Sequence, residues 1–327
     1  MIITRTPVRI PIGGGGTDLP FYYKRFGGSL VTAAIDKYIY IAVRRRFYKE
    51  TRVSYSKTEI VKDNRDIEHP LVREALRLLD IKEGLEIVSI SDVPSGAGLG
   101  SSGSFLVGLL NALHTYRGEY ISKKVLAEEA CKIEMDILKE PVGKQDQYAA
   151  SFGGIIHMLL NKQGAVRVGP LNLSEQTIRD LENNIMLYYT SIRRSATKVL
   201  KEQKDAAERD KAKLEYLTKI RQIGADIKKA LEKGNTRRFG EWLNIHWQTK
   251  HQLSDSMSNP QIDEWYDLAL KNGAVGGKVM GAGGGGFFMF YCDTNKEKFR
   301  LAMERARLVE MPFRFDFDGT KVVFNSK

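Results

Sequence analysis

The chain has 327 residues, of which 42% are hydrophobic and 28% are charged, so we expect a globular protein with one large domain or two packed domains. The 51 Lys and Arg residues exceed the 40 Asp and Glu residues, but the basic residues are scattered or interleaved with acidic ones, which argues against a nucleic-acid partner. No apolar stretch is long enough to cross a membrane, the first residues lack the apolar block of a signal peptide, and two cysteines give no disulfide framework, so we expect a cytoplasmic protein without a membrane partner.

The N-terminal part of the chain alternates strand-like and helix-like segments. Strand-like segments are rich in β-branched and aromatic residues, and helix-like segments carry apolar residues three or four positions apart. We predict strands at residues 30–47, 85–93 and 153–160, and helices at residues 69–80, 102–116 and 122–139.

The character of the chain changes near residues 173–184, where we place a domain boundary. We therefore expect an N-terminal domain of residues 1–180 and a C-terminal domain of residues 181–327. In the second we predict a strand at residues 185–191, a long helical zone at 194–234, helices at 236–250 and 261–271, a strand at 287–292, a helix at 296–307 and a closing strand segment at 313–324. The whole pattern is α+β.

Three glycine-rich segments stand out, and the one with the most chemistry is "PSGAGLGSSGS" at residues 94–104. It follows a predicted strand and enters a predicted helix, so backbone N–H groups and the positive end of the helix dipole face the same place, as in a phosphate-binding loop. It is not a Walker loop, because no Lys-Ser/Thr pair follows, and its spacing differs from the dinucleotide fingerprint. A merely tight turn would need only one or two glycines. The candidate ATP-binding residues are Pro94, Gly96, Ala97, Gly98, Leu99, Gly100, Ser101, Ser102, Gly103 and Ser104.

This segment resembles the phosphate loop of the GHMP kinases. "TPVRIPIGGGGTDL" at residues 6–19 and "GGKVMGAGGGGF" at residues 276–287 resemble the first and third motifs of that superfamily, in the same order. The resemblance spans nearly the whole chain. It implies a two-domain α+β fold, with a ribosomal protein S5 domain 2-like N-terminal domain, a ferredoxin-like C-terminal domain and the active site between them.

The resemblance also implies the cofactors and the metal ligands. ATP would be the phosphoryl donor with Mg²⁺, whose hard oxygen ligands would be Ser102 in the loop and Glu134 on a following helix. Asp136 is the alternative to Glu134.

Asp146 matches the catalytic base of the superfamily, and Arg9 matches a first-motif arginine near that base. Lys144, two residues from Asp146, would lower the pKa of its carboxyl group or stabilise the transferring charge. The alternative for Asp146 is a helix-capping residue.

The first motif departs from galactokinase, which has Gly-Glu-His where this chain has only glycine before Thr17 and Asp18. The chain is most similar to the branch of D-glycero-D-manno-heptose 7-phosphate kinases, which implies an anomeric sugar kinase whose partners are a phosphosugar and ATP. Arg193, Arg194, Lys24 and Arg25 are available for a distal phosphate, although Arg193 and Arg194 also fit a solvated helix start. The predicted substrate-binding residues are Gly14, Gly15, Gly16, Thr17, Asp18, Arg193, Gly283 and Gly284.

Three alternatives stay open at this point. The chain could be another anomeric sugar kinase, for L-fucose, galactose or a uronic acid. It could be a catalytically silent relative that senses sugar and ATP, or a nucleic-acid module. The adenine site is expected near residues 55–71, and a homodimer is the assembly to test.

Overall fold

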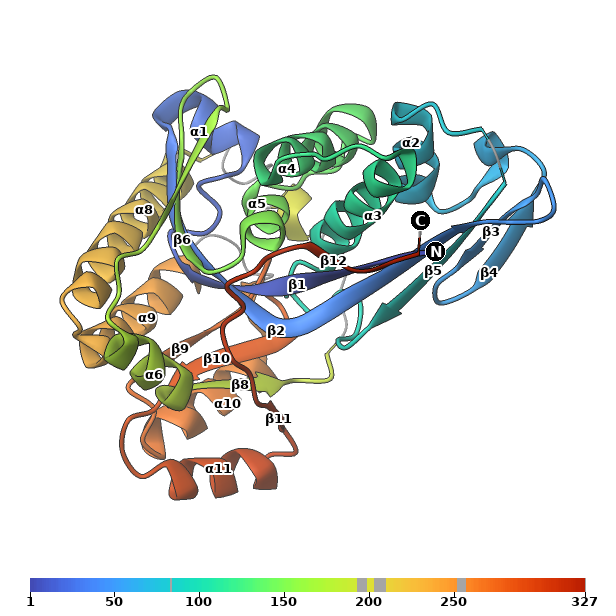
Figure 1. Ribbon diagram of the computed structural model, residues 1–327. Helices are drawn as coiled ribbons and strands as arrows, with labels where there is room; N and C mark the ends of the chain where they lie inside the picture. Colours follow the sequence, from blue (N-terminus) through green and yellow to red (C-terminus); the bar gives the residue numbers. More distant parts are fainter. Residues whose placement is uncertain (83, 193–198, 203–209, 252–256, 327) are drawn as a thin grey trace.

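The computed structural model describes residues 1–82, 84–192, 199–202, 210–251 and 257–326 (Figure 1). Two sheets, in which most neighbouring strands are antiparallel, lie one above the other in this view, each with its own helices. Within the described ranges, no helix is both long and apolar enough to span a membrane.

The larger sheet has strand order β12-β1-β2-β5-β3-β4, with β6 pairing β2 and β7 pairing β6. The strand at residues 30–47 is confirmed as β2, which is long enough to pair with β1, β5 and β6 along its length. The strands are β1 (Ile2–Gly13), β2 (Gly28–Arg45), β3 (Thr51–Ser54), β4 (Thr58–Val61), β5 (Leu85–Ser91), β6 (Ile155–Leu160), β7 (Val166–Pro170) and β12 (Lys321–Asn325).

Helices cover one face of this sheet, and α3 lies at their centre (Figure 1). It is apolar on nearly every side, as expected for a helix surrounded by sheet and by other helices. The N-terminal helices are α1 (Pro20–Phe26), η1 (Asn64–Asp66), α2 (Pro70–Leu78), α3 (Ser101–Arg117), α4 (Lys123–Cys131), the π-helix η2 (Lys132–Ile137) and α5 (Gln145–Phe152).

The smaller sheet has the order β11-β8-β10-β9, and all of its pairs are antiparallel. With the helices between its strands, this order is that of a ferredoxin-like domain, so the predicted α+β fold class is confirmed. Its elements are α6 (Glu175–Asn184), β8 (Ile185–Tyr189), α8 (Lys211–Glu232), α9 (Thr236–His251), α10 (Pro260–Lys271), β9 (Gly276–Val279), β10 (Phe287–Tyr291), α11 (Lys296–Arg305) and β11 (Val309–Met311).

Two parts of residues 181–327, helix α8 and strand β12, pack against the larger sheet, so the predicted boundary at residue 180 does not coincide with the division between the two sheets. Helix α8 packs against β1 and β2 of the larger sheet, where Gly224 approaches the backbone of Gly13 and Gly14 closely. Ile223 and Ile227 of α8 are buried in the same core cluster as those strands. The apolar stripe of α8 therefore finds its partner in the N-terminal sheet, although the stripe lies far along the chain.

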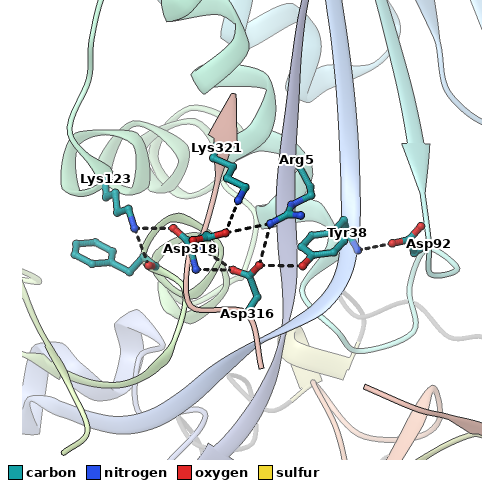
Figure 2. Close-up of polar contacts among 9 residues, drawn as sticks. Arg5, Tyr38, Asp92, Lys123, Asp316, Asp318 and Lys321 are labelled. Carbon is teal, nitrogen blue, oxygen red and sulfur yellow. Dashed lines mark hydrogen bonds and ion pairs between the residues drawn. The ribbon is translucent and has the colours of Figure 1, made fainter. Parts of the chain in front are cut away.

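The last segment of the chain also returns to the larger sheet. The Asp316 carboxylate accepts a 3.0 Å hydrogen bond from the Tyr38 hydroxyl, and the Asp318 carboxylate accepts one of 3.2 Å from Arg5 (Figure 2). The Lys123 ammonium donates to the Asp318 carbonyl oxygen at 2.7 Å. These contacts fix the segment before β12 pairs with β1, so the closing strand belongs to the N-terminal domain.

The helix predicted at residues 122–139 is interrupted by a π-helical turn at Lys132–Ile137. Ser122 accepts a hydrogen bond from the Val125 N–H and begins the helix as expected. The wider turn faces Glu134 inward, where its side chain is buried, while Asp136 is exposed. Such turns inside helices are frequent at functional sites.

His114 links the helix that follows the phosphate loop to the helix that precedes Glu134. Its two ring nitrogens lie 2.7 Å from carboxylate oxygens of Glu119 and Glu129. Burial lowers the pKa of His114, but the hydrogen bonds to Glu129 and Glu119 outweigh burial, so the net shift is upward from 6.5.

A raised pKa in the folded state means that this stabilisation is complete below pH 6.5 and is lost as the pH rises through the folded-state pKa. We expect His114→Gln to lower the free energy of unfolding by about 1 kcal/mol at pH 6, with a smaller difference at pH 9. Urea unfolding of both proteins at the two pH values measures this. A difference that grows with pH would contradict the assignment.

Candidate active site

A cavity of about 1180 Å³, part of it open to solvent, lies between the two sheets. Segments far apart in the sequence contribute to its walls: the first glycine-rich motif, the loop at residues 94–104, the loop before α5, helix α9 and the third motif.

The loop at residues 94–104 alternates between two environments. Gly96, Gly98 and Gly100 line the cavity and have φ values of +72°, +83° and +76°, which only glycine adopts easily. Between them, Ala97 and Leu99 are buried. The alternating glycines are therefore needed for the backbone path, and the residues between them hold the loop in place.

Helix α3 begins at Ser101, with Gly100 in the left-handed conformation at its N-cap. Ser101 and Ser102 line the cavity at this positive helix end, where unpaired N–H groups favour an anion. Ser104 serves a different purpose, because its hydroxyl is buried and donates to the Pro7 carbonyl at 2.8 Å. Gly103 also has a packing role, since a Cβ there would lie 2.8 Å from Asp146 Cβ. Pro94, Ala97, Leu99, Gly103 and Ser104 are not among the cavity-lining residues.

Asp146 and Arg9 meet beside this loop, as the sequence predicts. Arg9 Nε donates to Asp146 Oδ1 at 2.8 Å, and a second guanidinium nitrogen lies 2.6 Å from the same oxygen. Arg9 also donates to the Gly98 carbonyl at 2.6 Å. Within the described residues Asp146 Oδ2 accepts no hydrogen bond, so it is available to a ligand in the cavity. Asp146 is the second residue of α5 and Lys144 is the N-cap, so the capping alternative is wrong.

Ser102 and Glu134 also meet. The Ser102 hydroxyl donates to Glu134 Oε1 at 2.6 Å, and Gln147 Nε2 donates to the other carboxylate oxygen at 2.5 Å. Burial raises the pKa of Glu134 to about 7, and the two hydrogen bonds only partly offset this effect. Both side chains line the cavity, whereas Asp136 does not.

The structure does not bring Lys144 to Asp146. Its ammonium donates to the Gly164 carbonyl at 2.6 Å and lies 5.9 Å from the centre of the Tyr23 ring. Lys144 is also absent from the cavity wall. The predicted effect on the Asp146 carboxyl therefore has no contact to support it, because the side chain extends toward the hairpin between β6 and β7.

The first glycine-rich motif, residues 6–19, contributes the Asp18 carboxylate and glycine backbone to the cavity. Gly15, Gly16 and Asp18 line it. Asp18 accepts hydrogen bonds from the backbone N–H groups of Gln145 and Gly16. Burial raises the pKa of Asp18, the Gln145 amide lowers it, and the nearby Asp146 charge raises it further. A Cβ on Gly143 would lie 2.0 Å from Asp18 Oδ2, so this glycine makes room for the carboxylate.

Gly14 and Thr17, which were predicted to bind substrate, do not line the cavity, and their contacts are structural. The Thr17 hydroxyl donates to the carbonyl oxygens of Gly14 and Ser29 at 2.8 and 3.0 Å and is fully buried. A Cβ on Gly14 would lie 2.4 Å from the Ser29 carbonyl oxygen. Both residues hold the motif against β2.

The four consecutive glycines of the third motif, Gly283 to Gly286, lie next to the loop at residues 94–104. A Cβ on Gly286 would lie 2.3 Å from the Ala97 carbonyl oxygen, which accepts a 3.2 Å hydrogen bond from the Phe287 N–H. Gly283 and Gly284 contact Met257 and do not line the cavity, whereas Gly281 and Ala282 beside them do, so their role toward a substrate stays a prediction. The predicted residue Arg193 lies outside the described residues.

Several side chains that line the cavity were not predicted from the sequence motifs. They include His246 and Lys250 from α9, Lys278 from β9, and Gln145 beside Asp146. Lys278 lies within the third motif, so the motif itself contained that signal. His246 and Lys250 are four positions apart on one helix and therefore lie on the same face. Only the structure shows that this face lines the cavity.

A glycine-lined helix N-terminus, a carboxylate–arginine pair and a serine–glutamate pair therefore meet in one cavity. Residues 70–154 match the family described as GHMP kinases N terminal domain, and residues 227–309 match the GHMP kinases C terminal family. The chain belongs to the GHMP kinase family and is a phosphotransferase with an alcohol group as acceptor.

Individual relatives agree with this assignment. The chain is 32% identical to the D-glycero-alpha-D-manno-heptose 7-phosphate kinase of Campylobacter jejuni, over 98% of each chain. The crystal structure of a D-glycero-D-manno-heptose 1-phosphate kinase from Bacteroides thetaiotaomicron has a TM-score of 0.82 and 26% identity over 100% of both chains. A galactokinase of Pyrococcus furiosus is 25% identical, over 91% of this chain and 90% of that relative.

Proposed function

We propose that this enzyme transfers the terminal phosphoryl group of ATP to the anomeric hydroxyl of D-glycero-D-manno-heptose 7-phosphate. The observation that carries the proposal is the Asp146–Arg9 pair beside the glycine loop, in a cavity whose first motif presents only backbone and Asp18 to the sugar. The names of the two heptose kinase relatives differ in the phosphate that they mention, so the position phosphorylated is part of the test.

Each residue has a role in the proposed reaction. The oxygen of the anomeric hydroxyl attacks the terminal phosphorus of ATP, the bond from that phosphorus to the bridging oxygen breaks, and ADP leaves. Asp146 Oδ2 accepts the hydroxyl proton, while Arg9 holds Oδ1 and fixes the carboxylate orientation. The N–H groups of the loop and of the start of α3 bind the phosphates.

The residues present fit a magnesium ion at Ser102 and Glu134. Their oxygens lie 2.6 Å apart and are hard donors, and a cation would offset the cost of ionising a carboxylate whose pKa is about 7 when buried. Within the described residues no group of three or more His, Cys, Asp or Glu side chains is arranged to hold a metal, which suits an ion bound partly by ATP phosphates. Bound Mg²⁺ would supply positive charge against the transferring phosphates.

The sugar would lie against Asp18 and Gln145. Asp18 is buried and accepts hydrogen bonds on both oxygens, and Gln145 Nε2 is buried without a partner in the described structure. Buried amide donors are nearly always satisfied, so a sugar hydroxyl is a suitable acceptor for Gln145. Gly15 lies next to the Gln145 amide, where a side chain would reduce the space.

The adenine base would lie near His69, inside the predicted region of residues 55–71. The His69 ring stacks on Phe105 with centroids 5.0 Å apart and contacts Tyr55 edge-on at 4.6 Å. Phe105 is one turn along α3 from the phosphate loop, so an aromatic surface adjoins the phosphate site. His69 Nδ1 is buried without a partner among the described residues and suits a ring nitrogen or amine.

A substrate panel tests the proposal. We expect kcat/KM for the 7-phosphorylated heptose to exceed that for unphosphorylated heptose, L-fucose, galactose and uronic acids by tenfold or more, with a 1,7-bisphosphate product identified by phosphorus NMR. Preference for a neutral hexose by tenfold or more would contradict the proposal. Binding of sugar and ATP without turnover would indicate a sensor instead. The cytoplasmic location and the homodimer remain predictions.

A further inference from the structure

Three basic side chains from the C-terminal part of the chain line one wall of the cavity. His246 and Lys250 lie one turn apart on α9, and Lys278 lies on the adjoining strand β9. The Lys250 ammonium donates to the Gly281 carbonyl at 2.7 Å, and the Lys278 ammonium donates to the Ile12 carbonyl at 3.0 Å. The wall therefore joins α9, the third motif and the end of β1.

His246 is an unsatisfied polar group on this wall. Its exposed fraction is 2%, and neither ring nitrogen has a hydrogen-bond partner in the described structure. Buried polar side chains normally find partners, so the free ring nitrogens indicate a ligand that the cavity accommodates. Burial lowers the pKa of His246, and the charges of Lys278 and Lys250 lower it further, so the ring would act as a neutral N–H donor.

The buried cation of this wall is Lys278. Lys278 has an exposed fraction of 2%, and the charges that act on it are those of Lys250 and Arg9, which are also positive. Burial lowers the pKa of Lys278 first, and these two cations add to the effect. Within the part of the chain that the structure describes, the charged groups that act on this buried ammonium are cations, which is costly, and an anion in the cavity would offset that cost.

We infer that His246, Lys250 and Lys278 form an anion site that binds the distal phosphate of the sugar. The inference rests on the proposed function for the identity of the sugar, but the site itself rests on the wall described above. It replaces the earlier assignment in part: Lys24 and Arg25 are exposed on α1 and absent from the cavity wall, while Arg193 and Arg194 lie outside the described residues. The terminal phosphate of ATP is the other anion that such a wall could contact, and the test separates the two.

Lys250→Gln tests the site because it removes one charge and keeps most of the side chain. We expect the KM for heptose 7-phosphate to rise by about tenfold to a hundredfold, because a charge-assisted hydrogen bond to phosphate is lost. The KM for ATP and the kcat/KM for unphosphorylated heptose should stay within twofold of the wild type. Lys219→Gln, at an exposed position on α8, is the matched control and should change none of these values. His246→Asn should repeat the Lys250 pattern in a smaller degree.

Two results would overturn the inference: an equal loss of kcat/KM on both sugars, or a rise in the KM for ATP with no change for the phosphosugar. A calorimetric titration of inorganic phosphate, with saturating ADP on the loop, separates this failure from failure of the proposed function. Phosphate should bind Lys250→Gln at least fivefold more weakly than wild type, whichever sugar the enzyme prefers. Equal phosphate affinity in the two proteins would refute the anion site by itself.

Discussion

Replacing Asp146 with Asn is expected to lower kcat by about a thousandfold, because a positioned general base contributes about 10²–10⁴ in rate. The amide keeps the size of the side chain and can still contact Arg9, which now holds Oδ1 at 2.8 Å. It cannot accept the proton of the acceptor hydroxyl. Steady-state kinetics with ATP and the phosphosugar measure the effect. The KM values should change little, because the substitution removes an interaction that is made mainly in the transition state.

The control for this variant is Asp136→Asn, the same chemical change at an exposed carboxylate ten residues earlier, outside the cavity wall. It should retain full activity. Thermal unfolding of both variants checks that each folds, since loss of the Arg9 ion pair otherwise offers a second explanation. Near-wild-type turnover by a folded Asp146→Asn enzyme would remove Asp146 from the role of base.

Replacing Glu134 with Gln is expected to lower kcat by about a hundredfold and to raise the Mg²⁺ concentration needed for half-maximal rate, because one anionic ligand to the ion is lost. The neutral amide can still accept the 2.6 Å hydrogen bond from Ser102, so the local packing should survive. Removal of a buried carboxylate whose pKa is raised to about 7 should also leave the nucleotide-free protein no less stable at pH 8. Magnesium titrations of the rate and urea unfolding provide the two measurements.

Glu128→Gln on α4 is the matched control, because Glu128 is exposed and lies only six residues before Glu134. It should show the wild-type Mg²⁺ dependence. If Glu134→Gln keeps the wild-type magnesium requirement, the ion is bound elsewhere and the Ser102–Glu134 pair is structural.

The Asp146 and Glu134 carboxylates show what the sequence could predict about the site. Asp146 was identified from its motif, and the structure brings it to Arg9, 137 positions away in the chain, as that motif implies. Helical spacing separates the two acidic residues, because Glu134 lies four and three positions after the buried residues Ala130 and Cys131, whereas Asp136 lies on the opposite, exposed face.

The glycine motifs show the same division. The alternating glycines of residues 94–104 predicted an anion-binding loop from the sequence alone. Positive φ and close approach of the backbone are local requirements, and glycine meets them with the least strain. The local sequence did not predict why the third motif has four consecutive glycines, Gly283 to Gly286. The atom that excludes a side chain at Gly286 is the carbonyl oxygen of Ala97, which is 189 positions earlier in the chain. The residues next to Gly286 therefore could not predict this contact.

By itself, the sequence predicted the α+β class, and its resemblance to the GHMP kinases pointed to the loop at residues 94–104 and to Asp146, Arg9, Ser102 and Glu134, with Asp136 as the alternative to Glu134. Only the tertiary structure decided that α8 and β12 belong with the N-terminal sheet, that Thr17 and Lys144 face away from the cavity, and that a basic wall from α9 and β9 faces Asp18 and the loop. The physical reason is the range of the interactions. Backbone conformation and capping depend on neighbours in the chain, whereas burial, pairing of charges and the shape of a cavity depend on which surfaces meet when distant segments pack together.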